Sequence, residues 1–318
     1  MQSALIFADH RDIHALRVKE RCETILGRDC SIVQTASFPK ETLITTNLLG
    51  LSHESIIEAE NNIRIPESVC GIWRRRLWRH KVSDDLESLS DREISRNDSR
   101  LALEGFFLAC SDQLRVMNDP RTEVAGESKT YQLKIASECG IRIPITCISN
   151  DPSRVIEFVN ANAQLGHQVI YKAFASPSNK FISTKLFDAD DFERLSSLMF
   201  APDIFQEFIE GIDLRITYVD GDIFPARIIT RTRDANRDWR IDGISEVVHF
   251  PLSEHHSVQI TKLMNRLGLV YGALDFKLTN DRELVFLEVN PWGQYLFVEI
   301  QTNLEISLSI AKWLVGIR

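Results

Sequence analysis

The sequence has no apolar run long enough to cross a membrane. A membrane-spanning helix needs about 20 predominantly apolar residues, and the 318 residues contain no such run. The short apolar stretch at 4–8 has no basic region before it, so it does not match a secretory signal peptide. We therefore expect a cytoplasmic protein without a membrane partner, in which residues 4–8 form the first strand.

The chain also lacks an excess of positive charge. Its 37 Lys and Arg residues stand against 45 Asp and Glu, which gives a formal net charge of −8 at pH 7. A nucleic-acid binder needs a basic face for the phosphates. The charge balance therefore predicts no nucleic-acid partner, although it allows a local basic patch.

Two kinds of reactive-residue motif are absent as well. The six cysteines are scattered, with no C-x-x-C pair and no His partner at zinc-ligand spacing, so we expect buried, reduced thiols. No serine lies in a G-x-S-x-G elbow. These absences argue against a zinc protein and against a serine hydrolase.

The first 120 residues alternate strand-like and helix-like patterns. A strand, a helix and a strand give the β-α-β opening of a doubly wound α/β domain, at 4–8, 14–27 and 31–35. More strands are expected near 43–49, 55–60 and 69–73. The charged stretch 81–100 predicts a solvated helix or loop, and 100–114 predicts an apolar helix. Asn118-Asp119-Pro120 then breaks the pattern, so we place the main domain boundary there, between residues 1–120 and 121–318.

The second part contains more strands. We expect helices at 127–139, from Asp151-Pro152 onward, at 190–199, 254–267 and 304–314. Single strands are expected at 143–148, 168–173, 181–186 and 204–209. Two hairpins are predicted at 214–230 and 270–290, the first around the turn Asp220-Gly221-Asp222. We divide this part into a small lobe at about 121–208 and a large lobe at about 209–318.

The second hairpin carries a candidate metal site. Glu288 and Asn290 are two residues apart on one strand, so their side chains leave the same face. Asp275 lies on the neighbouring strand and can reach that face. Two carboxylates and an amide oxygen are hard ligands suited to Mg²⁺, which takes its other oxygens from water and phosphate. The alternative is a solvated hairpin with chance acidic residues.

Four cations are candidates for binding phosphate. Lys129 opens a predicted helix, and Lys172 ends an apolar strand, where an ammonium needs an anionic partner. Arg215 and Arg227 lie on adjoining hairpin strands and together could place planar donors over a transferring phosphoryl group. Each of the four alone is more often an ordinary surface charge.

A strand before Gly211 is a candidate nucleotide contact. It alternates apolar and polar residues in Gln206, Glu207, Phe208 and Ile209. Such a segment offers backbone donors and acceptors to an adenine edge while its apolar side chains cover the ring. The alternative is an ordinary half-buried strand.

The order of these residues resembles that of a known superfamily. Along the chain they run Lys129, Lys172, Gln206 to Ile209, Asp213 and Arg215, Arg227, Asp275, and Glu288-x-Asn290-Pro291. Over roughly the last three-fifths of the chain this order resembles the ATP-grasp ligases, such as D-alanine ligases, glutathione synthetases and ribosomal-protein glutamate ligases.

The resemblance implies an ATP-grasp fold behind an N-terminal pre-ATP-grasp domain, and a role for each candidate. The ATP-binding residues would be Lys129, Lys172, Gln206, Glu207, Phe208, Ile209 and Asp213. The catalytic residues at the reacting phosphoryl group would be Arg215 and Arg227. The ligands of two Mg²⁺ ions would be Asp275, Glu288 and Asn290. The cofactors implied are thus ATP and Mg²⁺.

Further motifs are similar to the microviridin-type ATP-grasp peptide maturases. They are Glu127-Ser128-Lys129-x-x-Gln132-Leu133, Ile141-Arg142-Ile143-Pro144, Asp238-Trp239-Arg240, Tyr271-Gly272-Ala273-x-Asp275-Phe276, Asn290-Pro291-x-Gly293-Gln294-Tyr295 and Trp73-x-Arg75-Arg76. That family joins carboxylates of a ribosomal precursor peptide to its own hydroxyls or amines, often guided by a leader peptide. The resemblance also implies a homodimer, since related ligases are commonly dimers.

Two positions depart from the family pattern. The loop at 174–181 lacks the glycines that many ATP-grasp enzymes place over phosphates, and Trp292 stands where the maturases usually carry a small polar residue. The basic patch of Arg75 and Arg76, together with Trp239 and Arg240, is the candidate substrate-binding surface. The alternative for the patch is a solvated charged edge over two tryptophans.

The sequence therefore predicts an ATP- and Mg²⁺-dependent ligase, and three hypotheses for its function remain. The first is a peptide maturase that forms macrolactones or macrolactams. The second is a ligase that adds amino acids to a small molecule or a protein tail. The third is a nucleotide-binding module without turnover, against which an intact metal set argues.

Overall fold

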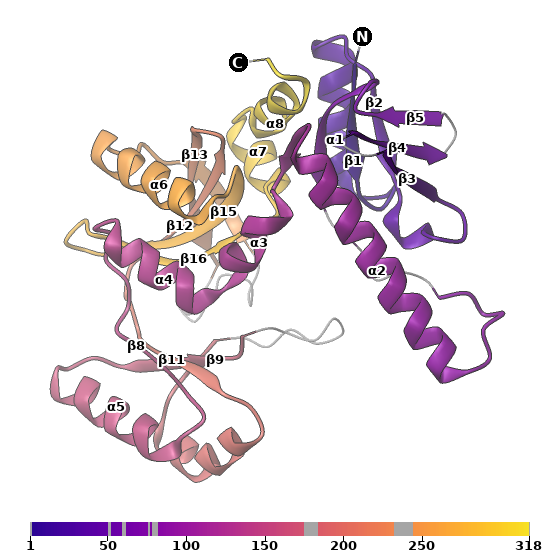
Figure 1. Cartoon of the computed structure of the whole chain (residues 1–318). Coiled ribbons are helices and arrows are strands. Elements are labelled where there is room, and N and C mark those ends of the chain that lie inside the picture. Colours follow the sequence, from indigo (N-terminus) through magenta and orange to yellow (C-terminus); the bar gives the residue numbers. More distant parts are fainter. Residues whose placement is uncertain are drawn as a thin grey trace.

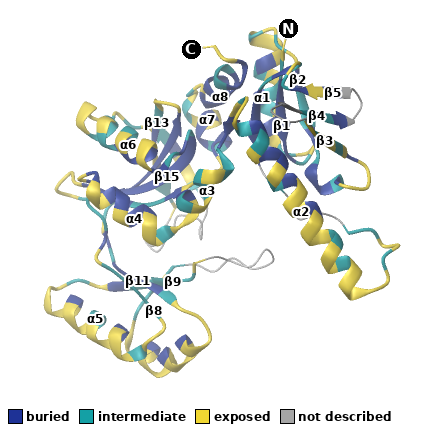
Figure 2. Cartoon of the chain, in the orientation of Figure 1, coloured by how far each residue is buried: buried dark blue, intermediate teal, exposed yellow. Residues whose placement is uncertain are grey.

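The computed structural model describes residues 2–49, 52–58, 62–75, 77, 82–174, 184–231 and 244–317. Figure 1 shows three parts: an N-terminal sheet with its helices, a central sheet, and a small lobe at the far end. Buried residues concentrate in the first two parts, while the helices of the small lobe expose most of their surface (Figure 2). Among the described residues, no helix is both long and apolar enough to cross a membrane.

The N-terminal sheet is parallel and has helices on both faces. Its strand order is β2-β1-β6-β7, with bounds β1 Ser3–Phe7, β2 Cys30–Val33, β6 Val69–Arg74 and β7 Arg115–Met117. Along β1 the side chains alternate: Leu5 and Phe7 pack with the α2 aromatics, and Ala4 and Ile6 pack toward α1 and α8. The doubly wound α/β opening is confirmed.

The helices of this part differ from the prediction in extent. α1 covers Ile13–Glu20, capped by Asp12, and a π-helical turn, η1, continues it over Arg21–Ile25. α2 covers Leu89–Ser111 as one continuous helix, so the predicted division near residue 100 is wrong. The exposed first half has no glycine or proline before Gly105, and nothing therefore ends the helix there.

A second, antiparallel sheet lies beside the first. It consists of β3 Leu43–Leu49, β4 Ser52–Glu58 and β5 Asn62–Ile65. Ile57, Ile63 and Ile65 join the same core as Phe7 and the α2 aromatics. A short 3₁₀ turn, η2 (Thr35–Ser37), connects β2 to this sheet.

Two helices lead out of the N-terminal part. α3 covers Pro120–Glu127 and α4 covers Lys129–Glu138. Asp119 caps α3 with Pro120 at its first position, so the break in the sequence is the start of a helix that was not predicted. Ser128 ends α3 and caps α4, so the helix expected over 127–139 is α4, which begins two residues later than predicted.

The small lobe is an antiparallel sheet under two helices. Its strand order is β10-β9-β11-β8, with bounds β8 Thr146–Ser149, β9 Val169–Lys172, β10 Lys185–Leu186 and β11 Asp203–Glu207. α5 covers Pro152–Gln164 with the predicted Asp151 cap. The second helix, η3, is of 3₁₀ type over Ala189–Met199 and is capped by Asp188, so the predicted start at residue 190 is wrong by one residue.

The central sheet is antiparallel, in the order β14-β13-β12-β15-β16. Its strands are β12 Ile212–Val219, β13 Asp222–Thr230, β14 Ile244–His249, β15 Tyr271–Leu278 and β16 Leu284–Asn290. α4 and α6 (Glu254–Leu267) cover one face through Leu214, Ile216 and Phe276. Both hairpins are confirmed, whereas β14 was not predicted.

The chain closes on the opposite face of that sheet. α7 (Leu296–Thr302) and α8 (Ile306–Val315) pack there against Val219 and Tyr271. They also reach the N-terminal sheet, where the Gly71 position leaves no room for a side chain because a Cβ would lie 2.3 Å from the carbonyl oxygen of Leu314. α7 was not predicted from the sequence.

Asn118 ties the N-terminal sheet to the central sheet. Its Oδ1 accepts the N–H groups of Val270 and Tyr271 at 2.9 and 2.8 Å, and its Nδ2 donates to the carbonyl oxygen of Tyr271 at 2.9 Å. The side chain is buried. Removing it would leave three backbone groups, two of them buried, without these partners.

We expect Asn118→Ala to lower the free energy of unfolding by about 2–4 kcal/mol, because buried groups lose their hydrogen bonds without gaining water. Urea denaturation followed by fluorescence measures this. The exposed Asn150 gives the control variant Asn150→Ala, for which a change within about 0.5 kcal/mol is expected. Equal losses in the two variants would contradict the assignment.

Candidate active site

The predicted acidic residues gather on one face of the central sheet. In the register, Asp275 lies directly opposite Glu288, and Ala273 lies opposite Asn290. Arg215 lies opposite Asp275 on the other neighbouring strand. Directly opposed residues share a face, so Arg215, Asp275, Glu288 and Asn290 stand together on the face away from α4 and α6. Metal binding by these residues stays a prediction.

Both carboxylates of this face are held by cations. The Arg215 Nη1 donates to Asp275 Oδ1 at 2.8 Å, and both side chains are buried. The Lys129 ammonium, at the first residue of α4, donates to Glu288 Oε2. A buried carboxylate is costly without a partner, and these two pairs meet that cost.

The donor set fits magnesium in its chemistry. Carboxylate and amide oxygens are the ligands that Mg²⁺ takes from proteins, and the Asn290 Oδ1 already accepts the Trp292 N–H at 2.8 Å, which fixes its orientation. Throughout the described ranges, no three His, Cys, Asp or Glu side chains cluster as a metal site. A magnesium site here therefore depends on Asn290 and on oxygens from a bound phosphate group.

Arg227 is separated from Arg215 by the sheet itself. The β12–β13 register pairs Leu214 with Arg227 and Arg215 with Ala226. Neighbouring residues on a strand leave opposite faces, so Arg227 points to the α4 and α6 side, where it is exposed. The expectation that both guanidiniums lie over one phosphoryl group is therefore wrong.

The candidate adenine segment ends β11 and is already engaged with its own lobe. Gln206 donates through Nε2 to the Thr146 hydroxyl at 3.0 Å. Glu207 accepts from Arg142 Nη2 at 3.0 Å and from the Ile145 N–H at 3.2 Å. The Phe208 N–H donates to the Gln168 carbonyl at 2.8 Å. The buried side chains of Gln206 and Glu207 thus brace the sheet.

The remaining phosphate and ribose candidates lie on two different sheets. Lys172 is the last residue of β9, opposite Ile204 and half-buried. Asp213 is buried on β12, and its Oδ1 receives the Lys277 ammonium at 2.8 Å. Lys277 was not among the sequence candidates, although its position two residues after Asp275 places it on the same face. The two-residue spacing from Asp275 is the sequence signal that indicates Lys277.

The basic patch does not form a solvated edge. Arg75 is 1% exposed, and its Nη1 donates to the Trp292 carbonyl at 2.6 Å. Its Nε lies 3.7 Å from an Asp12 oxygen. For Arg75 the solvated-edge alternative is wrong, and the side chain secures the turn after Asn290. Arg76, Trp239 and Arg240 lie outside the described residues.

Trp292 is fixed on both sides. Its indole N–H donates to Glu127 Oε1 at 2.7 Å, and the Arg74 guanidinium lies 5.6 Å from its ring. Arg74 in turn pairs with Glu123 at 2.8 Å. Burial raises the pKa of the Glu123 carboxyl to about 7, and the Arg74 charge opposes that rise. Trp292, which departs from the family pattern, is therefore fixed in position beside Asn290 by these contacts.

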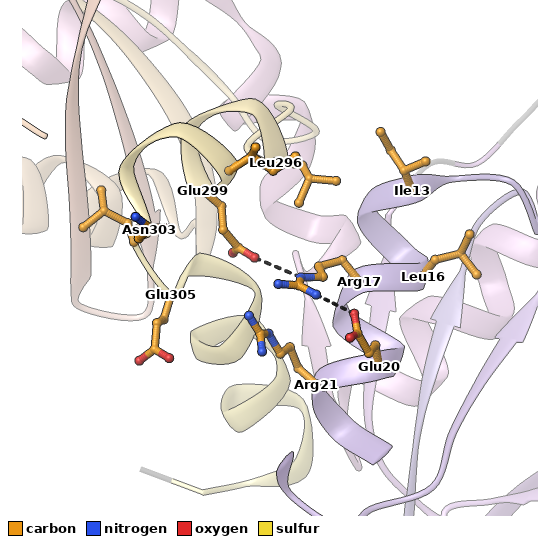
Figure 3. Close-up of a pocket in the computed structure, with 11 residues that line it drawn as sticks. Ile13, Leu16, Arg17, Glu20, Arg21, Leu296, Glu299, Asn303 and Glu305 are labelled. Carbon is orange, nitrogen blue, oxygen red and sulfur yellow. Dashed lines mark hydrogen bonds and ion pairs between the residues drawn. The ribbon is translucent and has the colours of Figure 1, made fainter. Parts of the chain in front are cut away.

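A separate hollow of about 660 Å³ lies between α1 and the α7–α8 segment. Figure 3 shows Arg17 in it, bonded to Glu299 on one side and to Glu20 on the other. All of its lining residues lie within 13–21 and 296–305. The hollow is thus not part of the acidic face.

Glu207 offers a test of the small lobe's architecture. We expect Glu207→Ala to lower the free energy of unfolding by about 2 kcal/mol, because Arg142 and the Ile145 N–H lose a buried acceptor. Glu207→Gln should lose less, since it keeps an acceptor oxygen. Thermal denaturation with limited proteolysis measures both effects. The exposed Glu210 provides the control Glu210→Ala, and a control as unstable as Glu207→Ala would overturn the assignment.

Known proteins are similar to the whole chain. The macrocyclase MdnC of Microcystis aeruginosa MRC, solved with the precursor peptide MdnA, is 26% identical with a TM-score of 0.86, covering 99% of this chain and 100% of that one. The macrocyclase MdnB of the same organism is 28% identical with a TM-score of 0.80, covering 99% of each chain. A peptide-associated ATP-grasp ligase of Chryseobacterium gregarium, 24% identical, has a TM-score of 0.89 over 99% of this chain and 97% of that one.

A curated relative agrees with the structural neighbours. The alpha-aminoadipate–LysW ligase LysX of Sulfurisphaera tokodaii is 23% identical over 279 residues, which are 82% of this chain and 95% of the relative. No family model matches the sequence. The chain therefore has the fold of the ATP-grasp ligases, and its sequence is similar over nearly the full length to two peptide macrocyclases, with more than one quarter of the residues identical.

Proposed function

We propose that this chain is an ATP- and Mg²⁺-dependent ligase that activates Asp or Glu side chains of a ribosomal precursor peptide. It would join them to hydroxyls or amines of the same peptide as macrolactones or macrolactams. The observation that carries this is the acidic face of the central sheet, in a chain similar over its full length to a macrocyclase solved with its precursor peptide.

The first step is attack of a peptide carboxylate oxygen on the γ-phosphorus of ATP, which forms an acyl-phosphate and ADP. Catalysis of this step is mostly positioning and charge neutralisation. Lys129 and Lys172 would bind the phosphates, and Asp275, Glu288 and Asn290 would hold two magnesium ions. Bound magnesium neutralises charge on the phosphate oxygens. The Lys129–Glu288 pair must open for this, which makes Glu288 available as a ligand.

The second step is attack of a hydroxyl or amine on the acyl-phosphate carbon. The oxyanion that forms needs a fixed donor nearby. Arg215 is buried and held by Asp275 and by the Gln294 carbonyl at 3.1 Å. Within the part of the chain that the structure describes, its Nε–H has no acceptor, which leaves a donor for the oxyanion. Phosphate then leaves.

The same proposal includes the residues that contact the nucleotide and the division of the chain into lobes. Gln206 to Ile209 border the adenine, and Asp213 faces the ribose. We divide the chain into an N-terminal domain at 1–120, a small lobe at about 121–208 and a large lobe at about 209–318. The separate sheets of the small lobe and the central sheet support this division. Closure of the two lobes would retain the nucleotide.

The proposed binding partner of the site is the precursor peptide. We propose that the Trp292 side chain borders the acceptor group. Arg75 donates to the Trp292 carbonyl oxygen, so it affects substrate binding by positioning this tryptophan. Arg76, Trp239 and Arg240 are further candidates for contact with the peptide. We also propose that a leader peptide guides the substrate to the site and that the protein is a homodimer.

A second function is supported by the curated relative. LysX is named as a ligase of alpha-aminoadipate and LysW, so the same chemistry can join a small amino acid to another partner. Under this reading the carboxylate comes from a small molecule or a protein tail. A gene for a short peptide rich in Thr, Ser, Asp and Glu beside this one would favour the macrocyclase.

The first test is ATP turnover with and without a candidate precursor peptide, followed by mass spectrometry of the peptide. We expect peptide-dependent ADP release and loss of one water per bond formed. Glu288→Gln should abolish both, while Glu246→Gln, an exposed change on the same sheet, should preserve them. ADP release without a mass change favours the small-molecule ligase, and no binding of ATP contradicts both functions.

The two arginines give a second test. Arg215→Ala should lower kcat by about 100-fold or more, as expected for loss of an oxyanion donor. Arg227→Ala should lower it by less than about tenfold, because the side chain leaves the other face of the sheet. Single-turnover kinetics measure both. A larger loss for Arg227→Ala than for Arg215→Ala would reverse the assignment.

A further inference from the structure

Gln132 joins the first turn of α4 to the edge of the central sheet. It lies three residues after Lys129, so the two side chains leave the same side of the helix. Its Oε1 accepts the Val289 N–H at 2.9 Å, and its Nε2 donates to the Val289 carbonyl oxygen at 2.9 Å. Because β16 is the last strand of its sheet, the side-chain amide takes the place that a neighbouring strand would have at Val289.

The residue held in this way lies between two of the proposed metal ligands. Glu288 and Asn290 flank Val289 on β16. The Val289 side chain packs with Leu133 of α4 in the apolar core, so its two neighbours direct their side chains to the acidic face. Gln132 thus fixes the backbone between both proposed ligands from the edge of the sheet.

Three contacts join α3 and α4 to this end of β16, and they differ in burial. Lys129 donates to Glu288, and the Glu127 carboxylate accepts the Trp292 indole N–H at 2.7 Å. The Lys129 and Glu288 side chains are 25% and 19% exposed, whereas Gln132 is 2% exposed. When Glu288 becomes a metal ligand, its ion pair with Lys129 opens. The buried Gln132 amide then still holds the first turn of α4 at β16.

A magnesium ion shared between a phosphate and β16 needs this kind of support. Mg²⁺ demands a nearly ideal octahedron of oxygens at about 2.0–2.1 Å, so the phosphate that Lys129 would hold must keep one separation from the ligands of β16. Apolar packing is non-directional, whereas two directional hydrogen bonds to one residue fix the helix at that residue. Loss of a hydrogen bond that orients metal ligands typically lowers metal affinity by about 10–100-fold.

We propose that Gln132 is a positioning residue that couples magnesium binding to nucleotide binding. It fixes Lys129 relative to Glu288 and Asn290, so that an ATP phosphate and the two ligands of β16 hold the same ion. This rests on the proposed ATP-dependent function and extends it to a residue that acts only through Lys129 and Val289.

The inference predicts a selective loss of the effect of magnesium on nucleotide binding. Mg²⁺ should tighten the binding of ATP to the wild-type protein by about 10–100-fold relative to binding in EDTA, as is usual for two coupled ligands. In Gln132→Met, which has nearly the same length but no amide, this magnesium ratio should fall below about threefold. Binding of ATP in EDTA should change by less than about threefold, because Lys129 still provides its charge to the phosphates. Equilibrium binding without peptide measures both affinities.

Further variants separate this role from a loss of stability. Leu133→Ala removes a buried side chain of the same helix, so it should lower the free energy of unfolding and leave the magnesium ratio unchanged. Lys134→Met, an exposed change on α4, should match the wild type in both. Gln132→Asn keeps an amide that is too short to reach both Val289 groups, and its magnesium ratio should also fall. It provides the test if Gln132→Met does not fold.

The outcomes separate this inference from the proposed function. A wild-type protein that binds no ATP in either buffer overturns both. If the wild-type protein binds ATP equally in the two buffers, or if a folded Gln132 variant keeps the wild-type magnesium ratio, the role of Gln132 is overturned and ATP binding is not. The same holds if Gln132→Met weakens both affinities by one common factor, or if Leu133→Ala loses the ratio as well, because these are the results of a merely structural role.

Discussion

The ion pair between Arg215 and Asp275 is the constraint on which the site depends. Both side chains are buried on a sheet face, between the charged row of Asp213 and Lys277 and the uncharged row of Thr217 and Ala273, and each is costly without the other. Because the strands are antiparallel and in register, fixing this one pair also fixes the row of Asp213 and Lys277 before it and the Glu288 carboxylate beside it. The opposite face has no such desolvation cost, because its Leu, Ile and Phe side chains are buried against α4 and α6. This apolar packing stabilises the sheet, and the charged face is not needed for it.

The loop after β16 is held as tightly as the sheet. Successive carbonyl oxygens of Trp292, Gly293 and Gln294 accept from Arg75, the Tyr271 hydroxyl and Arg215. Three side chains from three separate parts of the sequence thus converge on one turn. A turn held in this way keeps Asn290 at the end of its strand, and it links the N-terminal sheet directly to the acidic face.

Much of the fold was readable from the sequence, and the exceptions have physical causes. The hairpins and α6 follow from clear periodicity and turn residues, and α6 begins and ends where the pattern placed it. β14 and α7 were missed because their patterns are short and become regular only through packing against each other and the core. The residues of the acidic face could be collected by spacing and resemblance. Which face Arg227 takes, however, is a matter of register, and the burial of Arg75 depends on contacts with Asp12 and Trp292, both far from it in sequence. Lys277 was overlooked because a lysine on a strand ordinarily reaches solvent.

The packing of α8 has a consequence for the order in which the chain becomes a folded protein. Strands β1 and β6 leave the ribosome well before α8, yet one face of their sheet is covered by Ile306, Ile310 and Leu314. During synthesis that apolar face stays uncovered until residues 306–315 have been made. The small lobe, whose sheet and helices lie within one continuous stretch of the chain, has no such delay. Until α8 has been made, the nascent chain therefore exposes one apolar face of this sheet, and transiently exposed apolar surface of this kind is prone to aggregation.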